Sequence, residues 1–571
     1  MFYKNWFILL LVLNFDLLIV ARERRNRDRD KDRRDRRDGS KKRSSRDRFN
    51  SILKDYDLSS QKNIVVFMSD DQDAVYESMS AMPKTQKWLS DQGTTFDNAF
   101  VTTPICCPSR STYLTGKYMH NHGVSTNNQE CCSDNWRDTQ EKFTFNNYLS
   151  QAGYYTSFIG KYMNEYSGNY VPPGWDYWTA LHKNSKYYNY TLARWTGSRH
   201  HYNRNPVPSM KKYSDQPHEY FTTVIADEVE TLLKLYNRKN RKLREKIHEA
   251  GEATGSSTTT SSSQEKPLLM YLNFPAPHGV EHAPATYQND YLDSIIPNEK
   301  EPMPYLKLPH RTDKAYNYTN NHDKNWFVKY QKPLTDDMGF FTDLLYARRM
   351  QTLKALDDSI DRIIKLFAKR GLLNDTYFIY TSDHGYHLGQ LGIAKGKSLP
   401  YDFDTRVPFY IRGPNIKRNQ VVKYPITNID LAPTILDLAN LGSSSKRMDG
   451  KSIKNLVLTD DKNNNINQGQ KRSMAWRDSF LVERGKDLPE VAKTIPKKPE
   501  RIDKYTKLEE MCEKKSYKDP CLPKQIWYCT KSLRSGSEMI DKDSEYVNKW
   551  EFRVRKCKRA TGFGVFANSN F

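Results

Sequence analysis

The amino-acid sequence predicts an α/β protein with a mostly parallel sheet and helices on both of its faces. Short apolar runs rich in β-branched and aromatic residues recur at residues 64–68, 154–159, 268–274, 377–380 and 407–411. Longer stretches with apolar residues at helical spacing, such as Tyr220–Leu235 and Leu344–Phe367, lie between them. Strands that alternate with helices favour parallel pairing through helical crossovers. With 571 residues, 37 % of them hydrophobic, the chain is neither wholly disordered nor a small disulfide scaffold.

The first 21 residues are predicted to be a secretory signal peptide. Lys4 precedes an apolar run over residues 6–20, and Ala21 is a small residue suited to cleavage. A signal anchor is the alternative, but a span needs roughly 20 apolar residues and Asp16 would be costly in a bilayer. No other run approaches membrane length. We therefore predict passage through the endoplasmic reticulum and Golgi to the outside or the cell surface, without an integral membrane span.

The net charge of +22 divides the rest of the chain into three parts. Residues 22–61 form a basic Arg/Asp-rich arm, predicted to be disordered, whose first 27 residues carry a net charge of +8. This arm is either a polyanion-binding segment or a spacer. Residues 461–571 carry a net charge of +9 and are predicted to be a partial basic hydrophilic C-terminal region. Between them, residues 62–460 form one large domain of nearly balanced charge. It contains an inserted flexible loop at residues 238–266, whose first part, RKNRKLREK, is predicted to be a basic helical piece. Since the chain is expected outside the cell, a nucleic acid is not the expected polyanion.

Secretion also decides how the cysteines and the Asn-x-Thr triplets are interpreted. Asn189, Asn317 and Asn374 each begin such a triplet and are candidate glycosylation sites. Four cysteines near the C-terminus allow two disulfides in any of three connectivities: Cys512, Cys521, Cys529 and Cys557. The other four form two adjacent pairs, at positions 106–107 and 131–132. Neighbouring cysteines rarely bridge each other, so the first pair needs another explanation.

Acidic turns follow two of the predicted strands. Asp70 and Asp71 come after the first strand, and Asp383 and His384 come after the strand at residues 377–380. In a parallel sheet both turns lie at the same edge, where ligands bind. Carboxylate oxygens suit a hard cation, Ca²⁺ or Mg²⁺, better than zinc.

A helix start at Cys106 predicts an anion-binding pocket. Pro108 and Ser109 favour the first turn of a helix, whose free backbone N–H groups attract an anion. Arg110 and Lys117 add positive charge, and we predict that Lys117 helps to bind the substrate. A tetrahedral oxyanion beside acidic turns would require a metal ion.

These residues resemble the signature of the sulfatase family. Residues 106–110 read Cys-Cys-Pro-Ser-Arg, and residues 114–116 read Leu-Thr-Gly. The resemblance implies the alkaline-phosphatase-like sulfatase fold. It also implies that the formylglycine-generating enzyme converts Cys106 to Cα-formylglycine in the endoplasmic reticulum. The hydrated aldehyde then provides the hydroxyl that attacks the sulfur of a sulfate ester.

The resemblance also implies roles for individual residues. Arg110 would hold the hydroxyl of the nucleophile, and His278 would bind sulfate and protonate the leaving oxygen. Lys161 and Lys397 would bind sulfate as well. Met163 stands where arylsulfatases carry a histidine, which leaves the base for sulfate release open. The ligands of one calcium ion would be Asp70, Asp71, formylglycine at Cys106, Asp383 and His384.

Longer stretches resemble the extracellular heparan-sulfate glucosamine 6-O-endosulfatases. They include TTPICCPSRSTYLTGKYMHNHGVSTNN, YTSDHGYHLGQLGIAKGKSLPYDFDTRVPFYIRGP and WRDSFLVERGK. The resemblance implies that heparan sulfate proteoglycan is the substrate, and that the chain stops inside the start of a longer hydrophilic region. An exo-acting N-acetylglucosamine-6-sulfatase is the second hypothesis. A non-catalytic heparan-sulfate-binding protein is the third.

Overall fold

The computed structural model describes most of the large central domain. It covers residues 61–458, 476–484 and 563–568, except residues 129, 198–205, 254–265, 296–300, 302, 319, 322–323, 325–327 and 329–330. The predicted signal peptide, residues 22–60 of the arm and the four C-terminal cysteines lie outside the described residues. No helix within the described part of the chain combines the length and the apolar character needed to cross a membrane.

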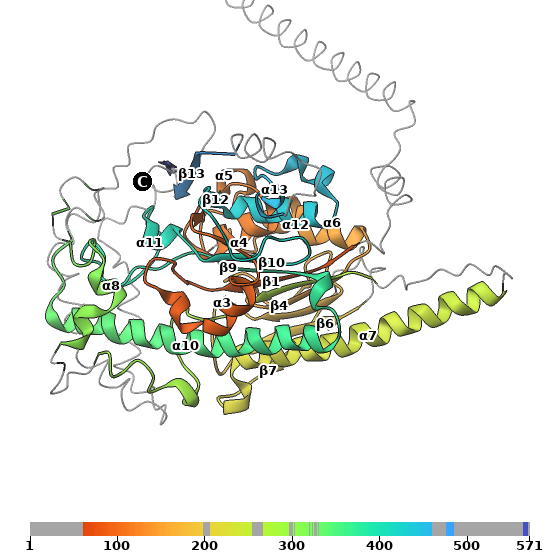
Figure 1. The fold of residues 1–571 in the computed structure, drawn as a ribbon, viewed down its shortest axis with the longest axis horizontal. Coiled ribbons are helices and arrows are strands. Elements are labelled where there is room, and N and C mark those ends of the chain that lie inside the picture. The colour runs from red at the N-terminus through yellow and green to blue at the C-terminus, as the bar shows by residue number, and fades with distance from the viewer. Residues whose placement is uncertain are drawn as a thin grey trace, which may run out of the picture. The chain divides into compact units, whose positions relative to one another are not determined.

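A ten-stranded mixed sheet forms the centre of the fold (Figure 1). Its five middle strands are parallel, in the order β9, β1, β8, β4, β5, while β10 and β6 run antiparallel to the strands beside them. The predicted α/β class with a mostly parallel sheet is therefore confirmed. The bounds of the ten strands are β1 Asn63–Ser69, β2 Thr94–Phe96, β4 Tyr155–Gly160, β5 Tyr177–Leu181, β6 Thr191–Thr196, β7 Ser209–Lys212, β8 Leu268–Asn273, β9 Thr376–Ser382, β10 Phe409–Arg412 and β11 Gln420–Val422.

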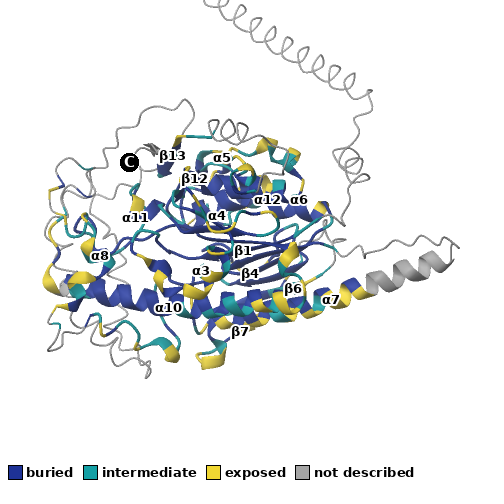
Figure 2. Ribbon diagram, viewed as in Figure 1, coloured by how far each residue is buried: buried dark blue, intermediate teal, exposed yellow. Residues whose placement is uncertain are grey.

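Helices cover both faces of the sheet. Below it in Figure 1 lie α3 (Pro83–Leu89), α7 (Phe221–Ala253) and α10 (Asp336–Lys369). Above it lie α4 (Cys106–Thr115), α5 (Met119–His122), α6 (Phe145–Gln151), α12 (Leu431–Leu438) and α13 (Lys454–Val457). Every residue of β1, β4, β8 and β9 is buried, as expected for parallel strands covered on two faces (Figure 2). Short helices α8 (Pro309–Thr312) and α11 (Asp402–Thr405) lie in the connections.

The long helix α7 includes the basic piece at residues 238–246, which we predicted to be helical, and extends to residue 253, beyond the predicted start of the loop. Its first half is anchored by buried apolar residues at helical spacing, including Ile225, Val229 and Leu232. The helix then continues through residues 238–253. This basic stretch is rich in Lys, Arg and Glu, which have high helix propensity. Only residues 254–265 remain as a predicted loop, and they lie outside the described residues.

The segment Trp476–Arg484 packs against the central domain, although we predicted the domain to end near residue 460. Arg477 makes a bidentate ion pair with Asp430, with N–O distances of 2.7 and 2.9 Å. The indole Nε1 of Trp476 donates to the carbonyl oxygen of Pro425 at 2.8 Å. Strand β13 (Ser479–Arg484) pairs with β14 (Phe563–Asn568). Residues 476–484 therefore pack onto the same domain as the described residues up to 458.

The contact between His120 and β13 predicts a pH-dependent docking. Glu483 accepts from His120, with 2.7 Å between Nδ1 and Oε2, and this hydrogen bond raises the pKa of His120 above its usual value. A histidine whose pKa is raised on folding stabilises the folded form at pH values below its unfolded pKa of about 6.5. This stabilisation is lost as the pH rises through the folded pKa. After correction for intrinsic exchange, amide protection of residues 479–484 should fall over that pH interval. His120→Gln should remove this dependence, and an unchanged dependence in the variant would contradict the assignment.

The three predicted glycosylation sites differ in their surroundings. Asn189 and Asn374 are exposed. Asn317 is half-buried, and its side-chain amide bonds the backbone of Leu334, accepting from the N–H at 2.6 Å. Asn189 and Asn374 are thus the more accessible positions, and glycosylation at all three stays a prediction.

Candidate active site

Three neighbouring parallel strands bring the predicted residues to one edge of the sheet. Ser69, the last residue of β1, lies opposite Ser382, the last residue of β9. The two acidic turns that follow are joined directly, because the backbone N–H of Asp71 donates to Asp383 Oδ1 at 2.9 Å. Strand β8 leads into the turn that carries His278, and that turn is fixed by a bond from Asp70 N to the carbonyl of Ala276 at 2.9 Å.

Strand β4 delivers Lys161 to the same edge. It ends at Gly160, whose φ of +120° and close approach to Asn273 leave no space for a side chain. A Cβ at Gly160 would lie 1.8 Å from the carbonyl oxygen of Asn273. Lys161 follows and is fully buried, with its Nζ 2.7 Å from Asp70 Oδ2. The glycine therefore permits a buried lysine beside the acidic turns.

Helix α4 brings Cys106 and Arg110 to the centre from above the sheet. Cys106 is the first residue of this helix and is buried. Arg110 lies one turn later, with Nε donating to Asp383 Oδ2 at 3.0 Å and Nη2 lying 3.3 Å from Asp70 Oδ1. Its Nη1 also donates to the carbonyl oxygen of Lys161 at 2.8 Å. A single guanidinium thus links α4 to the ends of three strands.

Three further side chains surround the sulfur of Cys106. Lys397 Nζ lies 3.0 Å from Sγ and also bonds Asp71. His384 Nε2 lies 3.5 Å from the same sulfur and 3.3 Å from Asp71 Oδ1. His278 is partly open to solvent, and its Nε2 lies 3.9 Å from Asp71 Oδ2. The thiol is therefore enclosed by nitrogen-bearing side chains that can hold an anion.

The charges of the centre depend on each other. Burial opposes ionisation of Asp70, but Lys161, His278 and Arg110 outweigh it and hold the pKa of this carboxyl well below its usual range. Burial raises the pKa of Asp383 to about 6, despite the nearby charge of His384. Burial also opposes the thiolate of Cys106, yet Lys161 and Lys397 hold the pKa of the thiol well below its usual value. The centre thus combines buried carboxylates with positively charged side chains that favour a bound anion.

Five buried side chains form a group that fits a hard cation. One ligand atom from each lies within 4.8 Å of all the others. Asp70 Oδ1 accepts no hydrogen bond within the described residues, so it has a lone pair available. Carboxylate oxygens dominate the set, which suits calcium, and a single imidazole nitrogen is its least typical member. The members are Asp70, Asp71, Cys106, Asp383 and His384.

Lys117 is the one predicted residue that the structure does not bring to this centre. It lies just beyond the C-terminal end of α4, whereas Cys106 begins the helix, and ten helical residues span about 15 Å. Its Nζ donates to Gln140 Oε1 at 3.0 Å. It lines a surface hollow together with Tyr148 and Arg447. Lys117 therefore does not lie at the predicted anion pocket, and its part in binding the substrate stays a prediction.

Several contacts at the centre involve residues that we did not predict. Cys107 forms a disulfide with Cys131, which explains the second cysteine of the first pair and ties the start of α4 to the loop before α6. Ser185 donates to Asp70, and Arg349 donates to the carbonyl of Asp71 at 2.6 Å. Ser185 lies in the stretch KNSKYYNYT at residues 183–191, which resembles the same family, but the resemblance did not assign it a role. Arg349 lies in the middle of α10, and only the fold reveals it.

Met163 offers no proton acceptor at the position where arylsulfatases carry a histidine. It is buried, with 1 % of its surface exposed. The residue after it, Asn164, directs its backbone N–H to the sulfur of Cys107 at 3.3 Å. The base for the predicted release of sulfate therefore stays open.

The sequence is similar to several known sulfatases. A putative extracellular sulfatase Sulf-1 homolog of Caenorhabditis elegans is 38 % identical over 479 residues, which cover 83 % of this chain and 60 % of the relative. The extracellular sulfatase SULF-1 homolog of Drosophila melanogaster is 38 % identical over 74 % of this chain and 33 % of its own length. Human N-acetylglucosamine-6-sulfatase is 36 % identical over 74 % of this chain and 67 % of its own length. The chain thus spans only part of the first two relatives.

Solved structures share the fold at low sequence identity. A structure described as a complex with its substrate D-glucosamine-2-N,6-O-disulfate has a TM-score of 0.53 and 21 % identity, covering 75 % of this chain and 84 % of the other. A putative sulfatase from Bacteroides fragilis has a TM-score of 0.54 and 17 % identity, covering 76 % of this chain and 83 % of the other. The family model for sulfatases matches residues 62–441. The chain therefore belongs to the sulfatase family.

Proposed function

We propose that this protein is a calcium-dependent sulfatase that hydrolyses the 6-O-sulfate of glucosamine residues in heparan sulfate. The observation that carries the proposal is the position of Cys106. It begins α4 among Lys161, Lys397 and Arg110, directly beside the group of acidic side chains. Cations around a nucleophile at a helix start are what a tetrahedral, negatively charged sulfate group requires.

Conversion of Cys106 to formylglycine would supply a hydroxyl nucleophile for the sulfur atom, and calcium would stabilise negative charge on the sulfate oxygens. The remaining roles belong to side chains of the protein itself. Arg110 is locked by Asp383 and the carbonyl of Lys161, so it orients whatever occupies position 106. Lys161 and Lys397 neutralise the sulfate oxygens. His278, the most exposed of the group, would give a proton to the leaving sugar oxygen.

The glucosamine substrate is supported by the relatives. Two of them are named extracellular sulfatase homologs, and three are N-acetylglucosamine-6-sulfatases at 36 % identity. The names of the second group give a 6-sulfate on N-acetylglucosamine. The second candidate is therefore an exo-acting N-acetylglucosamine-6-sulfatase, which would remove 6-sulfate only from chain ends.

The proposal extends to the route of maturation. Formylglycine is made in the endoplasmic reticulum, so the protein would meet the formylglycine-generating enzyme there before it passes through the Golgi. Heparan sulfate proteoglycan would be its partner at the cell surface or outside the cell. The names of the extracellular relatives support this route.

One experiment tests the reaction and separates the two candidates. The secreted protein is digested for peptide mass spectrometry, and intact heparin is incubated with it and analysed for 6-sulfate and for chain length. We expect formylglycine at position 106, an unmodified disulfide-bonded Cys107, and loss of 6-sulfate from internal disaccharides. Loss confined to the non-reducing ends would favour the exo-acting candidate. An unmodified Cys106 with no release of sulfate would contradict both.

A further inference from the structure

Glu281 is a buried carboxylate beside the centre that the mechanism above does not use. Only 7 % of its surface is exposed, and its Oε1 accepts no hydrogen bond from the described residues. Leaving a buried acceptor unpaired costs about 1–3 kcal/mol, and more for a charged group. Such an oxygen in a folded protein needs an explanation, and a partner supplied by a ligand is one.

The neighbours of Glu281 place it next to the predicted sulfate-binding residues. It follows His278 by three positions in the turn after β8, and its Oε1 lies 3.1 Å from where a Cβ on Gly279 would lie. Its charge acts on the hydroxyl of Tyr187 and on the ammonium of Lys395. Asp70 also interacts electrostatically with Tyr187, and Asp71 interacts in the same way with Lys395. Glu281 therefore borders the centre on the His278 side.

Tyr187 does not provide the missing donor. Its hydroxyl is directed to the carbonyl oxygens of Pro275 at 3.2 Å and His278 at 3.1 Å. The ring of Tyr187 is held in this orientation by stacking on Tyr220, with centroids 5.6 Å apart. The single hydroxyl proton is therefore occupied by the backbone of the turn, and it also fixes the position of His278.

The negative charge of Glu281 indicates which part of the substrate it can contact. A carboxylate repels sulfate, whose place is among Lys161, Lys397 and Arg110. Glu281 and the ammonium of Lys395 attract each other, so the carboxylate does not require a charged ligand and can accept from an uncharged donor. Hydroxyl and N–H groups are the uncharged donors of an amino sugar.

We propose that Glu281 accepts a hydrogen bond from a hydroxyl or N–H group of the hexosamine that carries the sulfate, and so selects the sugar. This inference rests on the proposed sulfatase function. A site that leaves a buried acceptor unpaired in the absence of the correct sugar discriminates strongly against sulfate esters that lack the donor. An aryl sulfate, which has no hydroxyl or N–H group beside its sulfate, is such an ester.

The test compares two substrates in Glu281 variants of the whole secreted protein. Glucosamine 6-sulfate and 4-methylumbelliferyl sulfate are assayed with wild type, Glu281→Met and Glu281→Gln. Methionine keeps the approximate size but has no strong acceptor, whereas glutamine keeps a carbonyl acceptor. We expect the ratio of kcat/KM for the sugar to that for the aryl sulfate to fall about tenfold in Glu281→Met. We expect a smaller fall in Glu281→Gln, with the loss mainly in KM.

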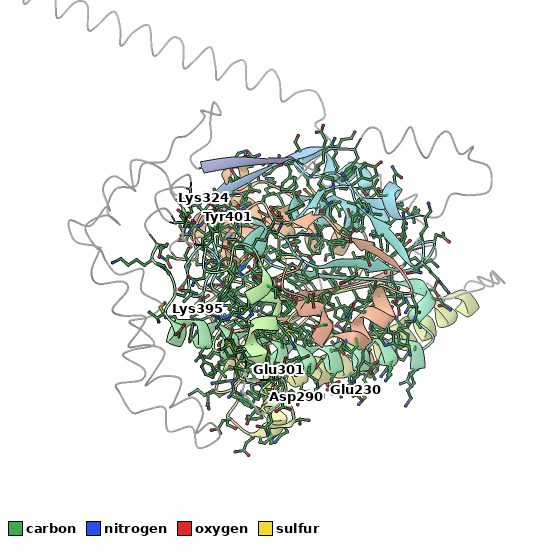
Figure 3. The ribbon with its side chains drawn as sticks, turned by 60° about the vertical axis from the view of Figure 1, so that its left-hand side comes forward. Glu230, Asp290, Glu301, Lys324, Lys395 and Tyr401 are labelled. Carbon is green, nitrogen blue, oxygen red and sulfur yellow. A yellow bond between two sulfur atoms is a disulfide. The ribbon has the colours of Figure 1, made fainter. Side chains whose placement is uncertain are left out.

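Glu230→Gln is the matched control. Glu230 is a half-buried glutamate on α7 that pairs with Lys234 and Arg362, and Figure 3 labels it well to the right of Lys395. Its substitution should leave the substrate ratio unchanged. Should Glu281→Met fail to fold, the ratio in Glu281→Gln still decides.

The outcomes separate this inference from the function on which it rests. An active enzyme whose substrate ratio is the same in wild type and both Glu281 variants contradicts the role of Glu281 alone. Equal losses on both substrates contradict it as well, because they would indicate that Glu281 only supports the turn of His278. A wild-type protein that carries no formylglycine and hydrolyses neither ester contradicts the proposed function itself.

Discussion

The Cys106→Ala variant is expected to lose sulfatase activity by about 10⁴-fold or more while keeping its fold. Removing a nucleophile abolishes the covalent route, and only the binding contributions of the surrounding residues remain. The fold should tolerate the change, because the side chain loses one heavy atom, which costs about 1 kcal/mol. Turnover of 4-methylumbelliferyl sulfate and the thermal midpoint, measured on the same preparation, check both statements.

Cys132→Ala is the matched control for this prediction. Cys132 is the other free cysteine among the described residues, and it is not a member of the group that fits a metal ion. Its substitution should leave turnover close to that of wild type. Activity of Cys106→Ala within tenfold of wild type would overturn the assignment of the nucleophile.

The Asp70→Asn variant is expected to lose activity that excess calcium does not restore. Asp70 is fully buried and pairs with Lys161 at 2.7 Å and with Arg110 at 3.3 Å. Removing its charge takes away a predicted calcium ligand and leaves two buried cations without this partner, which costs about 3–5 kcal/mol. In wild type, calcium at 100 times its Kd should add about 2.7 kcal/mol to the free energy of unfolding. In the variant this gain should be much smaller.

Asp357→Asn provides a buried carboxylate outside the centre for comparison. Asp357 accepts hydrogen bonds from the backbone N–H and the hydroxyl of Thr85, at 2.6 and 2.7 Å. Its loss should lower stability by about 1–3 kcal/mol, yet leave the response to calcium intact. Thermal midpoints and turnover over a calcium titration distinguish the two variants. Full recovery of Asp70→Asn at high calcium would argue against its role as a ligand.

Much of the centre could be predicted because its residues occupy positions that the chain defines locally. Asp70, Asp383 and Lys161 each come directly after a strand, and the β-branched, apolar runs before them were recognisable as buried strands. Parallel strands end at one edge, so local order along the chain translates into proximity in space. Cys106 and Arg110 belong to one helical turn, whose start was also recognisable.

Contacts between segments distant in the sequence could not be predicted in this way. The Cys107–Cys131 disulfide, the docking of β13 on His120 and the unpaired oxygen of Glu281 depend on how separate loops fold back over the sheet. Lys117 shows that proximity in the sequence does not guarantee proximity in the fold. It lies close to Cys106 in the sequence, yet the helix between them places the two at opposite ends.

The sequence by itself determined the α/β class, the family and the chemical nature of the centre. Strand periodicity, the turn residues after each strand and the helix start at Cys106 are local properties, and each is read within a few residues. The tertiary structure decided which of the candidate cations reach the centre, how the second cysteine is used, and that a buried carboxylate stands unpaired beside His278. These features arise from packing between elements far apart in the chain, and burial sets their energies.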